Sequence, residues 1–245
     1  MPSVPLFYQP DLTLSHLTTE ESHHAIRVLR MRIGAALEVT DGLGTLASAE
    51  LTSTESRKAA FKITNSTKFP RRASQIHLAV APTKNIDRME WMVEKCTEIG
   101  VDKISFVRCH TSERPKIPLE RLIKVAVSAM KQSEQVWMPE LGEMLPFDQF
   151  LSNVTEVQRF IAHVDETNSN HLTKMVKHQG DCILLVGPEG DFTKDELDLA
   201  ISIGFTKVSL GQNRLRTETA AIFGVVALNA RGSIADYSDL RITRT

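Results

Sequence analysis

The sequence predicts an α/β protein in which a small β-rich module precedes a larger domain built on a mainly parallel sheet. Short runs with partial alternation of apolar and polar residues fill the first 70 positions, whereas strands and helices alternate afterwards. Such alternation of strands with helices is typical of a parallel sheet covered on both faces. We therefore divide the chain into domains 1–70 and 71–245, with residues 68–72 as the linker.

The first module begins with a predicted helix that runs from Thr18 to about Arg30. Thr18 and Glu21 have the spacing of a capping box, which favours a helix start at this position. Three strands follow, at residues 36–42, 46–51 and 60–66. The glycine-rich segment 41–44 predicts a hairpin between the first two strands, and such strands close naturally into a small barrel or curled sheet.

The second domain contains five predicted strands, at residues 75–81, 103–107, 160–164, 182–186 and 207–210. Apolar residues at helical spacing predict a helix that ends at Gly100, and a longer helix runs from about Pro118 to Val136. Thr193 and Glu196 form a second capping box. Residues 220–230 are nearly all apolar, which indicates a helix buried in the core or against a partner subunit.

Ligands of open α/β sheets bind beyond the carboxyl ends of the strands. Three loops follow strand ends here, at residues 165–168, 187–192 and 211–216. The second loop combines Gly187 and Gly190, which allow close backbone approach, with Glu189 and Asp191, which would repel a phosphate. Neither the Walker nor the dinucleotide glycine signature occurs. The loop is therefore either a tight turn or the site of a neutral or cationic ligand.

The third loop carries two arginines immediately before the apolar helix. Thr217 is predicted to cap this helix, and Glu218 lies in its first turn, where a carboxylate suits the helix dipole. Arg214 and Arg216 are then either solvated side chains or ligand contacts.

Composition excludes several classes of protein. The net charge of −1 gives no support to a strongly basic nucleic-acid binder, so an RNA surface requires local clustering of arginine and lysine. Cys96, Cys109 and Cys182 are too sparse for a disulfide framework or a zinc site. No long apolar stretch or secretory signal is evident. We expect a cytoplasmic protein with no metal and no membrane partner.

Several motifs occur together and in a defined order. LLVGPEGDF at 184–192 is followed by VSLG and by LRTETA, and FYQP, HHAIRVLRMRIG, RMEWMVEKCTEIGV and TSER precede them. This arrangement resembles the 16S ribosomal RNA (uracil-N3)-methyltransferase family, which belongs to the SPOUT (trefoil-knot) class. The resemblance covers nearly the whole chain.

The resemblance implies a PUA-like RNA-binding domain at 1–70 and a SPOUT methyltransferase domain at 71–245 with a C-terminal trefoil knot. It implies methylation of N3 of a specific uridine in 16S ribosomal RNA, with S-adenosylmethionine as cofactor. It also implies a homodimer whose partner is 16S ribosomal RNA or the small ribosomal subunit.

The resemblance also assigns site residues. The cofactor-binding positions are His163, Gly187, Glu189, Gly190, Leu210, Gly211, Asn213, Leu215 and Arg216. The chain departs from the family pattern at Asp191, where glycine is usual, and at Gln135 and Asn213, where arginine is usual.

Methyl transfer to a uracil nitrogen requires that its proton leave and that the developing anion be stabilised. By position, Arg216 stabilises the anion, and Glu218 or His163 accepts the proton. The predicted RNA contacts are Arg27, Arg30 and Arg32 in the first domain and Lys84, Arg88 and Arg114 in the second. Arg27 and Arg30 are equally compatible with an ordinary solvated helix face.

Three alternatives remain open on sequence alone. A methyltransferase of the same fold would act on transfer RNA or on another ribosomal site. A non-catalytic RNA-binding factor would retain the fold without cofactor affinity, and the departures at Asp191 and Asn213 favour it. A Rossmann oxidoreductase is the most distant, because its glycine signature is missing.

Overall fold

The computed structural model describes residues 4–163 and 170–236, with side chains through residue 230. The chain forms two compact units. Unit 1 takes the chain up to residue 71 together with 127–138, and unit 2 takes the remainder. The predicted ligand loop at 165–168 lies outside the described residues.

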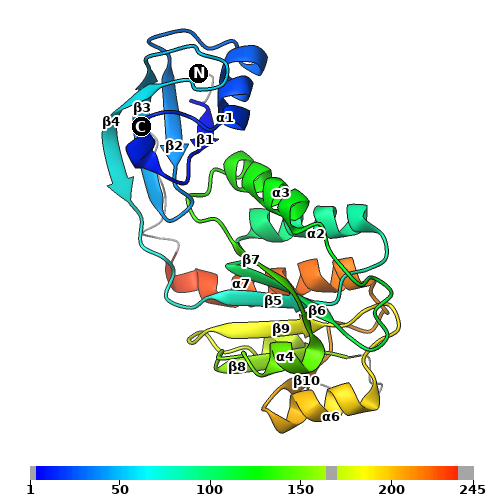
Figure 1. Ribbon diagram of the computed structural model, residues 1–245. Helices are drawn as coiled ribbons and strands as arrows, with labels where there is room; N and C mark the ends of the chain where they lie inside the picture. The colour runs from blue at the N-terminus through cyan, green and yellow to red at the C-terminus, as the bar shows by residue number, and fades with distance from the viewer. Residues whose placement is uncertain (1–3, 164–169, 237–245) are drawn as a thin grey trace. The chain divides into compact units, whose positions relative to one another are not determined.

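Unit 1 contains a four-stranded sheet in the order β1-β2-β3-β4 (Figure 1). Its strands are β1 (Leu6–Tyr8), β2 (Ala36–Thr40), β3 (Thr45–Leu51) and β4 (Phe61–Lys68). The pairing of β1 with β2 is parallel, and the other two pairings are antiparallel. A core of apolar side chains, which includes Phe7, Leu37 and Phe61, packs against one face of this sheet.

The predicted hairpin between β2 and β3 is confirmed. Oδ1 of Asp41 accepts hydrogen bonds from the backbone nitrogens of Leu43 (2.7 Å) and Thr45 (2.9 Å). Gly44 has a φ of +94°, and a Cβ at this position would lie 2.4 Å from the ring of Trp137. Both backbone conformation and space therefore require glycine at this turn.

The helix predicted to start after Thr18 forms, but its second half is π-helical. Thr18 caps α1 (Thr19–His23), and η2 (His24–Val28) continues it as a π-helix. The predicted end at Arg30 is wrong, because Arg30 has a left-handed φ of +53° that no helix accommodates. A short 3₁₀ turn, η1 (Leu12–Leu14), precedes α1.

Unit 2 contains a six-stranded sheet in the order β10-β8-β9-β5-β6-β7, and every pairing is parallel, as predicted. Its strands are β5 (Ile76–Val80), β6 (Lys103–Arg108), β7 (Glu140–Pro146), β8 (Gln158–Ala162), β9 (Cys182–Val186) and β10 (Thr206–Val208). Strand β5 and strand β9 are central and consist of buried residues throughout.

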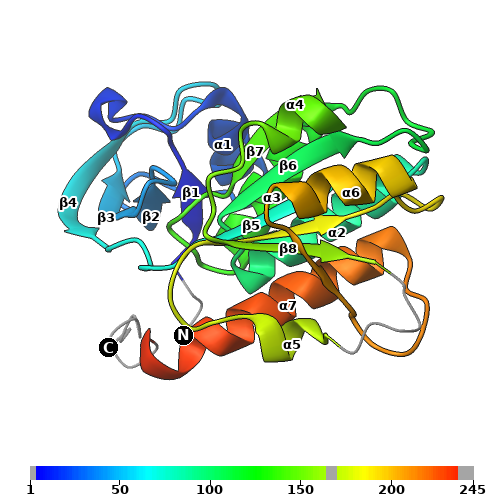
Figure 2. The same cartoon turned by 90° about the horizontal axis from the view of Figure 1, so that it is seen from below.

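Helices cover both faces of this sheet (Figure 2). They are α2 (Ile86–Ile99), α4 (Phe147–Leu151), α5 (Leu172–Met175), α6 (Lys194–Ser202) and α7 (Thr217–Asp236). Helix α3 (Leu119–Gln132) is divided between the two units, with residues 127–132 in unit 1. Helix α7 packs on β5, β9, α2 and α5, whereas apolar residues of α4 and α6 share the core on the opposite face. Among the described residues, none of the helices combines the length and the apolar character needed to cross a lipid bilayer.

The predicted end of α2 and start of α6 are confirmed, whereas the predicted end of α3 is wrong. Gly100 ends α2 with a φ of +95°, and Thr193 and Glu196 form a complete capping box at the start of α6. The predicted end of α3 at Val136 is wrong, because the helix stops at Gln132. Glu134 then adopts a left-handed φ of +57°, which turns the chain out of the helix.

Helix α7 is joined to β9 by close contacts near its first turns. The prediction that Thr217 caps this helix is wrong. Thr217 is its first residue, and its hydroxyl donates to the carbonyl of Gly187 (3.0 Å). A Cβ at Gly224 would lie 2.0 Å from Cδ2 of Leu184, so glycine allows the helix to lie directly on β9. These contacts place the start of α7 beside the loop that follows β9.

A buried hydrogen-bond chain links β5, β6 and the segment before β8. Nδ1 of His77 lies 2.5 Å from Oε1 of Glu156, and Nε2 lies 2.8 Å from Oγ of Ser105. Burial alone would raise the pKa of Glu156, but the hydrogen bond and the charge of His77 hold that pKa below its usual value of 4.5.

This lowered pKa predicts an acid-sensitive contribution to stability. A carboxyl with a depressed folded-state pKa stabilises the fold above its unfolded pKa and loses that contribution as the pH falls through the folded value. We expect the Tm of Glu156→Gln to fall less than that of the wild type as the pH drops below about 4.5. The control is Glu143→Gln at an exposed position. Parallel Tm curves for the wild type and Glu156→Gln would contradict the prediction.

Candidate cofactor and nucleic-acid site

A cavity of about 800 Å³ lies beyond the carboxyl ends of β8, β9 and β10 in unit 2. Its walls come from the residues that follow these three strands and from the first turns of α7. A volume of this size accommodates a small molecule or a cofactor. The lining residues that the argument uses are Arg88, His163, Gly187, Asp191, Arg216 and Glu218.

The loop after β9 is held in a tight turn by its own backbone. The backbone nitrogen of Asp191 donates to the carbonyl of Pro188 (3.0 Å). A Cβ at Gly187 would lie 2.9 Å from the ring of Phe192, and one at Gly190 would lie 3.0 Å from Cβ of Thr111. Both glycines are therefore required by close packing within unit 2, independently of any ligand.

The loop after β10 exposes its backbone to the cavity. Gly211 has a φ of +133°, and nothing lies within 4 Å of a Cβ built there, so only the backbone conformation demands glycine. Oγ of Ser209 accepts from the backbone nitrogen of Gly211 (3.2 Å). A guanidinium nitrogen of Arg214 donates to the carbonyl of Glu189 (3.4 Å), which joins the two loops.

A buried carboxylate faces this cavity with one oxygen unsatisfied. The side chain of Glu218 is 7% exposed, and its Oε1 lies 3.7 Å from Nε of Arg88. Its Oε2 is buried and has no hydrogen-bond partner among the described residues. Because an unsatisfied buried oxygen is costly, this position calls for a hydrogen-bond donor from a ligand.

His163 and Asp191 form a second polar pair at the cavity wall. Nδ1 of His163 lies 3.1 Å from Oδ2 and 3.3 Å from Oδ1 of the Asp191 carboxylate. Oδ1 also accepts from the backbone nitrogen of Phe192 (2.8 Å). Asp191 has a left-handed φ of +62°, the conformation that glycine adopts most readily.

Most of the residues assigned to the cofactor from the sequence come together here. His163, Gly187, Glu189, Leu210, Gly211, Asn213, Leu215 and Arg216 all line the cavity, as does Glu218. Gly190 is not part of the lining and packs against Thr111 instead. Arg216 is exposed, which leaves its guanidinium accessible to a bound substrate.

Sequence reasoning missed several lining residues, notably His171, Ser209, Gln212 and Thr217. Ser209 lies inside the strand predicted at 207–210, and it belongs to the loop only because β10 ends earlier, at Val208. His171 could not have been found from the sequence, because the loop that carries it has no distinctive local pattern. Nδ1 of His171 lies 2.8 Å from Oγ1 of Thr173, which fixes the ring at the start of α5.

The predicted RNA contacts of the second domain differ in their environment. Arg88 lines the cavity and pairs with Glu218. Arg114 donates hydrogen bonds to the carbonyls of Thr83 (3.1 Å) and Lys84, so most of its guanidinium holds this loop in place. Lys84 is exposed and lies 3.2 Å from a carboxylate oxygen of Glu113.

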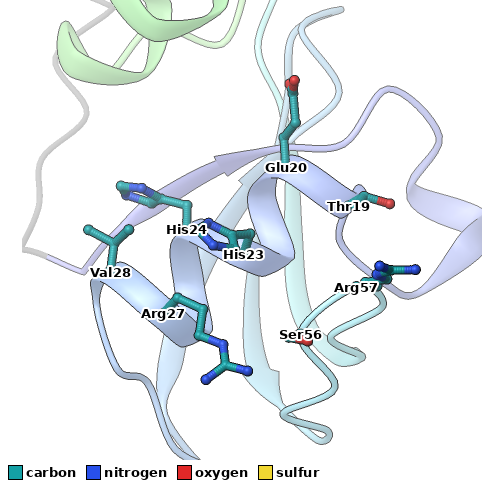
Figure 3. Close-up of a pocket in the computed structure, with 8 residues that line it drawn as sticks. All are labelled: Thr19, Glu20, His23, His24, Arg27, Val28, Ser56 and Arg57. Carbon is teal, nitrogen blue, oxygen red and sulfur yellow. The ribbon is translucent and has the colours of Figure 1, made fainter.

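Unit 1 carries a separate surface hollow of about 660 Å³ (Figure 3). Its lining residues are Thr19, Glu20, His23, His24, Arg27, Val28, Ser56 and Arg57. Figure 3 shows that Arg27 comes from the helical segment and Arg57 from the loop between β3 and β4. Arg57 was not predicted, although the adjacent pair Arg57 and Lys58 was a visible signal. Arg30 and Arg32 are exposed but lie outside this lining.

The cysteines are buried and unsuited to nucleophilic chemistry. Burial raises the pKa of Cys96 to about 12 and the pKa of Cys182 to about 12, so both remain thiols at neutral pH. Burial also raises the pKa of Cys109. In the part of the chain that the structure describes, no group of three or more His, Cys, Asp or Glu residues is arranged to hold a metal ion.

Comparison with known families finds two matches that divide the chain in sequence order. A family model described as the RNA methyltransferase PUA domain matches residues 17–64. A second, described as the RNA methyltransferase domain, matches residues 70–229, which includes every residue of the cavity.

Individual proteins of known sequence or structure are similar over most of the chain. Ribosomal RNA small subunit methyltransferase E from Synechocystis is 31% identical, covering 87% of this chain and 72% of the relative. A crystal structure of a probable rRNA-methyltransferase from Porphyromonas gingivalis is 37% identical with a TM-score of 0.84, covering 93% of this chain and 99% of that one.

A third similar structure contains a bound small molecule. It is a ribosomal RNA small subunit methyltransferase E from Neisseria gonorrhoeae, bound to S-adenosyl methionine. It is 26% identical with a TM-score of 0.83, covering 93% of this chain and 98% of that one.

Proposed function

Because this chain belongs to the RNA methyltransferase family that includes the ribosomal RNA small subunit methyltransferases E, we propose that it methylates N3 of a specific uridine in 16S ribosomal RNA. S-adenosylmethionine is the methyl donor, and the RNA or the small ribosomal subunit is the partner. The observation that carries the proposal is the cavity beyond β8, β9 and β10, where two backbone loops meet a buried carboxylate. A ribosomal substrate also places the enzyme in the cytoplasm.

The residues at the cavity fit S-adenosylmethionine. Oε2 of Glu218 needs a donor, and the cofactor offers an ammonium group, ribose hydroxyls and an adenine amino group. The loops at 187–191 and 209–216 supply backbone groups for binding, and neither contains a phosphate-binding glycine motif. When bound, S-adenosylmethionine supplies an electrophilic methyl group on a sulfonium sulfur.

The protein contributes alignment, charge stabilisation and proton transfer. Alignment of two bound reactants is worth roughly 7–11 kcal/mol in favourable cases. As the N3 proton of uracil leaves, negative charge develops on the uracil carbonyl oxygens, and the guanidinium of Arg216 stabilises it. His163 and Glu218 are the two candidate proton acceptors at the cavity wall.

RNA contacts follow from the same geometry. N3 of uridine is paired in a duplex, so the target base must be unpaired or flipped out to reach the cavity. Arg88 lines this cavity and is accessible to the base or its phosphate. The exposed Lys84 contacts the flanking RNA backbone, and Arg114 adds its charge while it holds the carbonyls of Thr83 and Lys84. In unit 1, Arg27, Arg30 and Arg32 contact phosphates, which position the RNA without specifying its sequence.

One exposed apolar side chain on α7 supports a homodimer. Val226 is 44% exposed on a helix that is otherwise largely buried in unit 2. A second copy of the chain would cover this side chain. Size-exclusion chromatography with light scattering measures the oligomeric state directly. We expect Val226→Asp to shift the equilibrium from dimer toward monomer.

Two measurements test the proposed function. Titration calorimetry should show binding of S-adenosylmethionine and of its demethylated product to the purified protein. Small ribosomal subunits that lack the modification should then gain one methyl group at N3 of a single uridine, detected by mass spectrometry of RNA digests. RNA binding without any cofactor affinity, even in the presence of RNA, would instead identify a non-catalytic RNA-binding factor.

We expect the two arginines that line the hollow in unit 1 to contribute to RNA affinity. We expect Arg27→Glu combined with Arg57→Glu to raise the KM for RNA about tenfold or more, with little change in kcat. Loss of each phosphate contact should also lower the slope of log binding constant against log salt concentration by about one unit. The control is Lys58→Glu, which carries the same charge change as either single substitution and lies beside the hollow but outside its lining. An unchanged KM for the double variant would show that the hollow does not contact RNA.

A further inference from the structure

His163 and Asp191 are 28 positions apart in the sequence, yet they form a hydrogen-bonded pair at the cavity wall. A carboxylate only accepts hydrogen bonds, so Nδ1 of His163 must carry the proton that lies between the two groups. In the neutral ring, Nε2 is then the unprotonated nitrogen and is available as a base. Among the described residues, none is hydrogen-bonded to Nε2 of His163.

Asp191 is held in this position by its backbone. The nitrogen of Phe192 donates to Oδ1 (2.8 Å), and the hydroxyl of Thr111 donates to the carbonyl of Asp191 (2.7 Å). Its φ of +62° lies in the left-handed region, which aspartate and asparagine tolerate better than most residues but less readily than glycine. A residue held in this region whose carboxylate meets a histidine at a cavity wall is a candidate for function, because the surroundings enforce its conformation.

Glu218, the other candidate proton acceptor, is less suited to take the proton from uridine N3. Its carboxylate lies beside the guanidinium of Arg88 at 3.7 Å and is buried at the start of α7. Protonation of Glu218 would remove the charge that pairs with the partly exposed guanidinium of Arg88. Its unsatisfied Oε2 is better suited to accept a hydrogen bond from a bound ligand throughout the reaction.

We propose that His163 is the proton acceptor of the reaction and that Asp191 is the positioning residue that fixes its tautomer. The inference rests on the proposed function. The proton of uridine N3 moves to Nε2, and the electron pair left on N3 forms the new bond to the methyl carbon. The electron pair of the broken methyl–sulfur bond stays on sulfur, and His163 later releases its proton to water. Asp191 remains ionised throughout.

The decisive variant is Asp191→Asn. Asparagine tolerates the left-handed conformation, and its side-chain oxygen can still accept from the nitrogen of Phe192. Its amide nitrogen then takes the place of Oδ2 and faces Nδ1 of His163, so the ring must carry its proton on Nε2 and cannot act as a base. We expect kcat to fall by about 10²-fold or more, with unchanged KM for RNA and unchanged affinity for the demethylated cofactor. The control is Asp198→Asn on the exposed face of α6, which should behave as wild type.

Asp191→Gly separates function from stability. Glycine adopts the left-handed φ more readily than aspartate, so the Tm should rise by roughly 2–4 °C while kcat falls. A purely structural role for Asp191 predicts that a more stable protein is at least as active. His163→Gln should lose turnover to the same extent as Asp191→Asn.

A measurement on the free protein is independent of catalysis. Nitrogen-15 NMR of histidine-labelled protein should show His163 with its proton on Nδ1 in the wild type and on Nε2 in Asp191→Asn. Suppose that the wild type is active. The roles proposed for His163 and Asp191 would then be overturned if both Asp191→Asn and His163→Gln kept kcat within threefold of the wild type, or if wild-type His163 already carried its proton on Nε2. Either result would leave the proposed function intact. A wild type that methylates no uridine would overturn the proposed function instead.

Discussion

Replacement of Arg216 by alanine is expected to lower kcat for uridine methylation by about 10²–10³-fold. Arg216 is exposed at the mouth of the cavity and is the arginine next to the start of α7. In the proposed mechanism, its guanidinium stabilises the charge that develops on the uracil carbonyls only as the proton leaves. The loss should therefore fall on kcat, measured by single-turnover methylation, while binding of the demethylated cofactor changes little.

Arg214→Ala is the matched control for this prediction. Arg214 has the same charge, lies two positions earlier and also lines the cavity, but its guanidinium is directed to the carbonyl of Glu189. We expect a reduction of less than about tenfold, because only a link between two loops is lost. Full turnover by Arg216→Ala would show that another group stabilises the uracil anion.

Gly44→Ala should have the largest effect on stability. The φ of +94° is unfavourable for alanine, and the new Cβ would lie 2.4 Å from the Trp137 ring and 2.8 Å from the carbonyl oxygen of Phe69. Together these should lower the free energy of unfolding of unit 1 by about 2–5 kcal/mol. Urea denaturation followed by Trp137 fluorescence in a Trp91→Phe background measures this directly.

Gly34→Ala provides the comparison for Gly44→Ala. Gly34 has a similar φ of +86°, but the nearest atom to a Cβ there is 3.7 Å away, so only the conformational cost of about 1–2 kcal/mol remains. Equal losses in both variants would show that Trp137 moves aside without cost. Cofactor binding should survive in both, because the cavity is formed by residues of unit 2 alone.

The features that the sequence predicted correctly depend on neighbouring residues. The hairpin at 41–44, the glycine end of α2 and the capping box at Thr193 each arise from backbone groups satisfied within a few positions. The parallel sheet with helices on both faces is confirmed for the same reason, because the alternation of element types is a property of the chain order. The SPOUT fold class preceded by a PUA-like module was implied by the family resemblance instead, and the matching families and structures confirm it.

The elements that were missed obtain their stability from partners distant in sequence. β7 (Glu140–Pro146) contains two glutamates, a glycine and a proline, which no strand pattern favours, and it forms because it pairs with the edge of β6. The Thr217 hydroxyl, expected to cap its own helix, donates instead to a carbonyl 30 residues away. Tertiary contacts overrode the local preference in both cases.

The sequence by itself determined which loops could hold a ligand, because strand ends, glycine loops and the arginines before α7 are encoded locally, and the family resemblance added methyl transfer. Only the tertiary structure decided which of them meet. His163 was one of two possible proton acceptors, and Asp191 was only a departure from a family pattern, until the parallel order of β8 and β9 brought both to the same sheet edge. Likewise, the pairing of Glu218 with Arg88 depends on the packing of α7 against α2. Distances across a fold depend on the packing of the whole core, which no local stretch of sequence specifies.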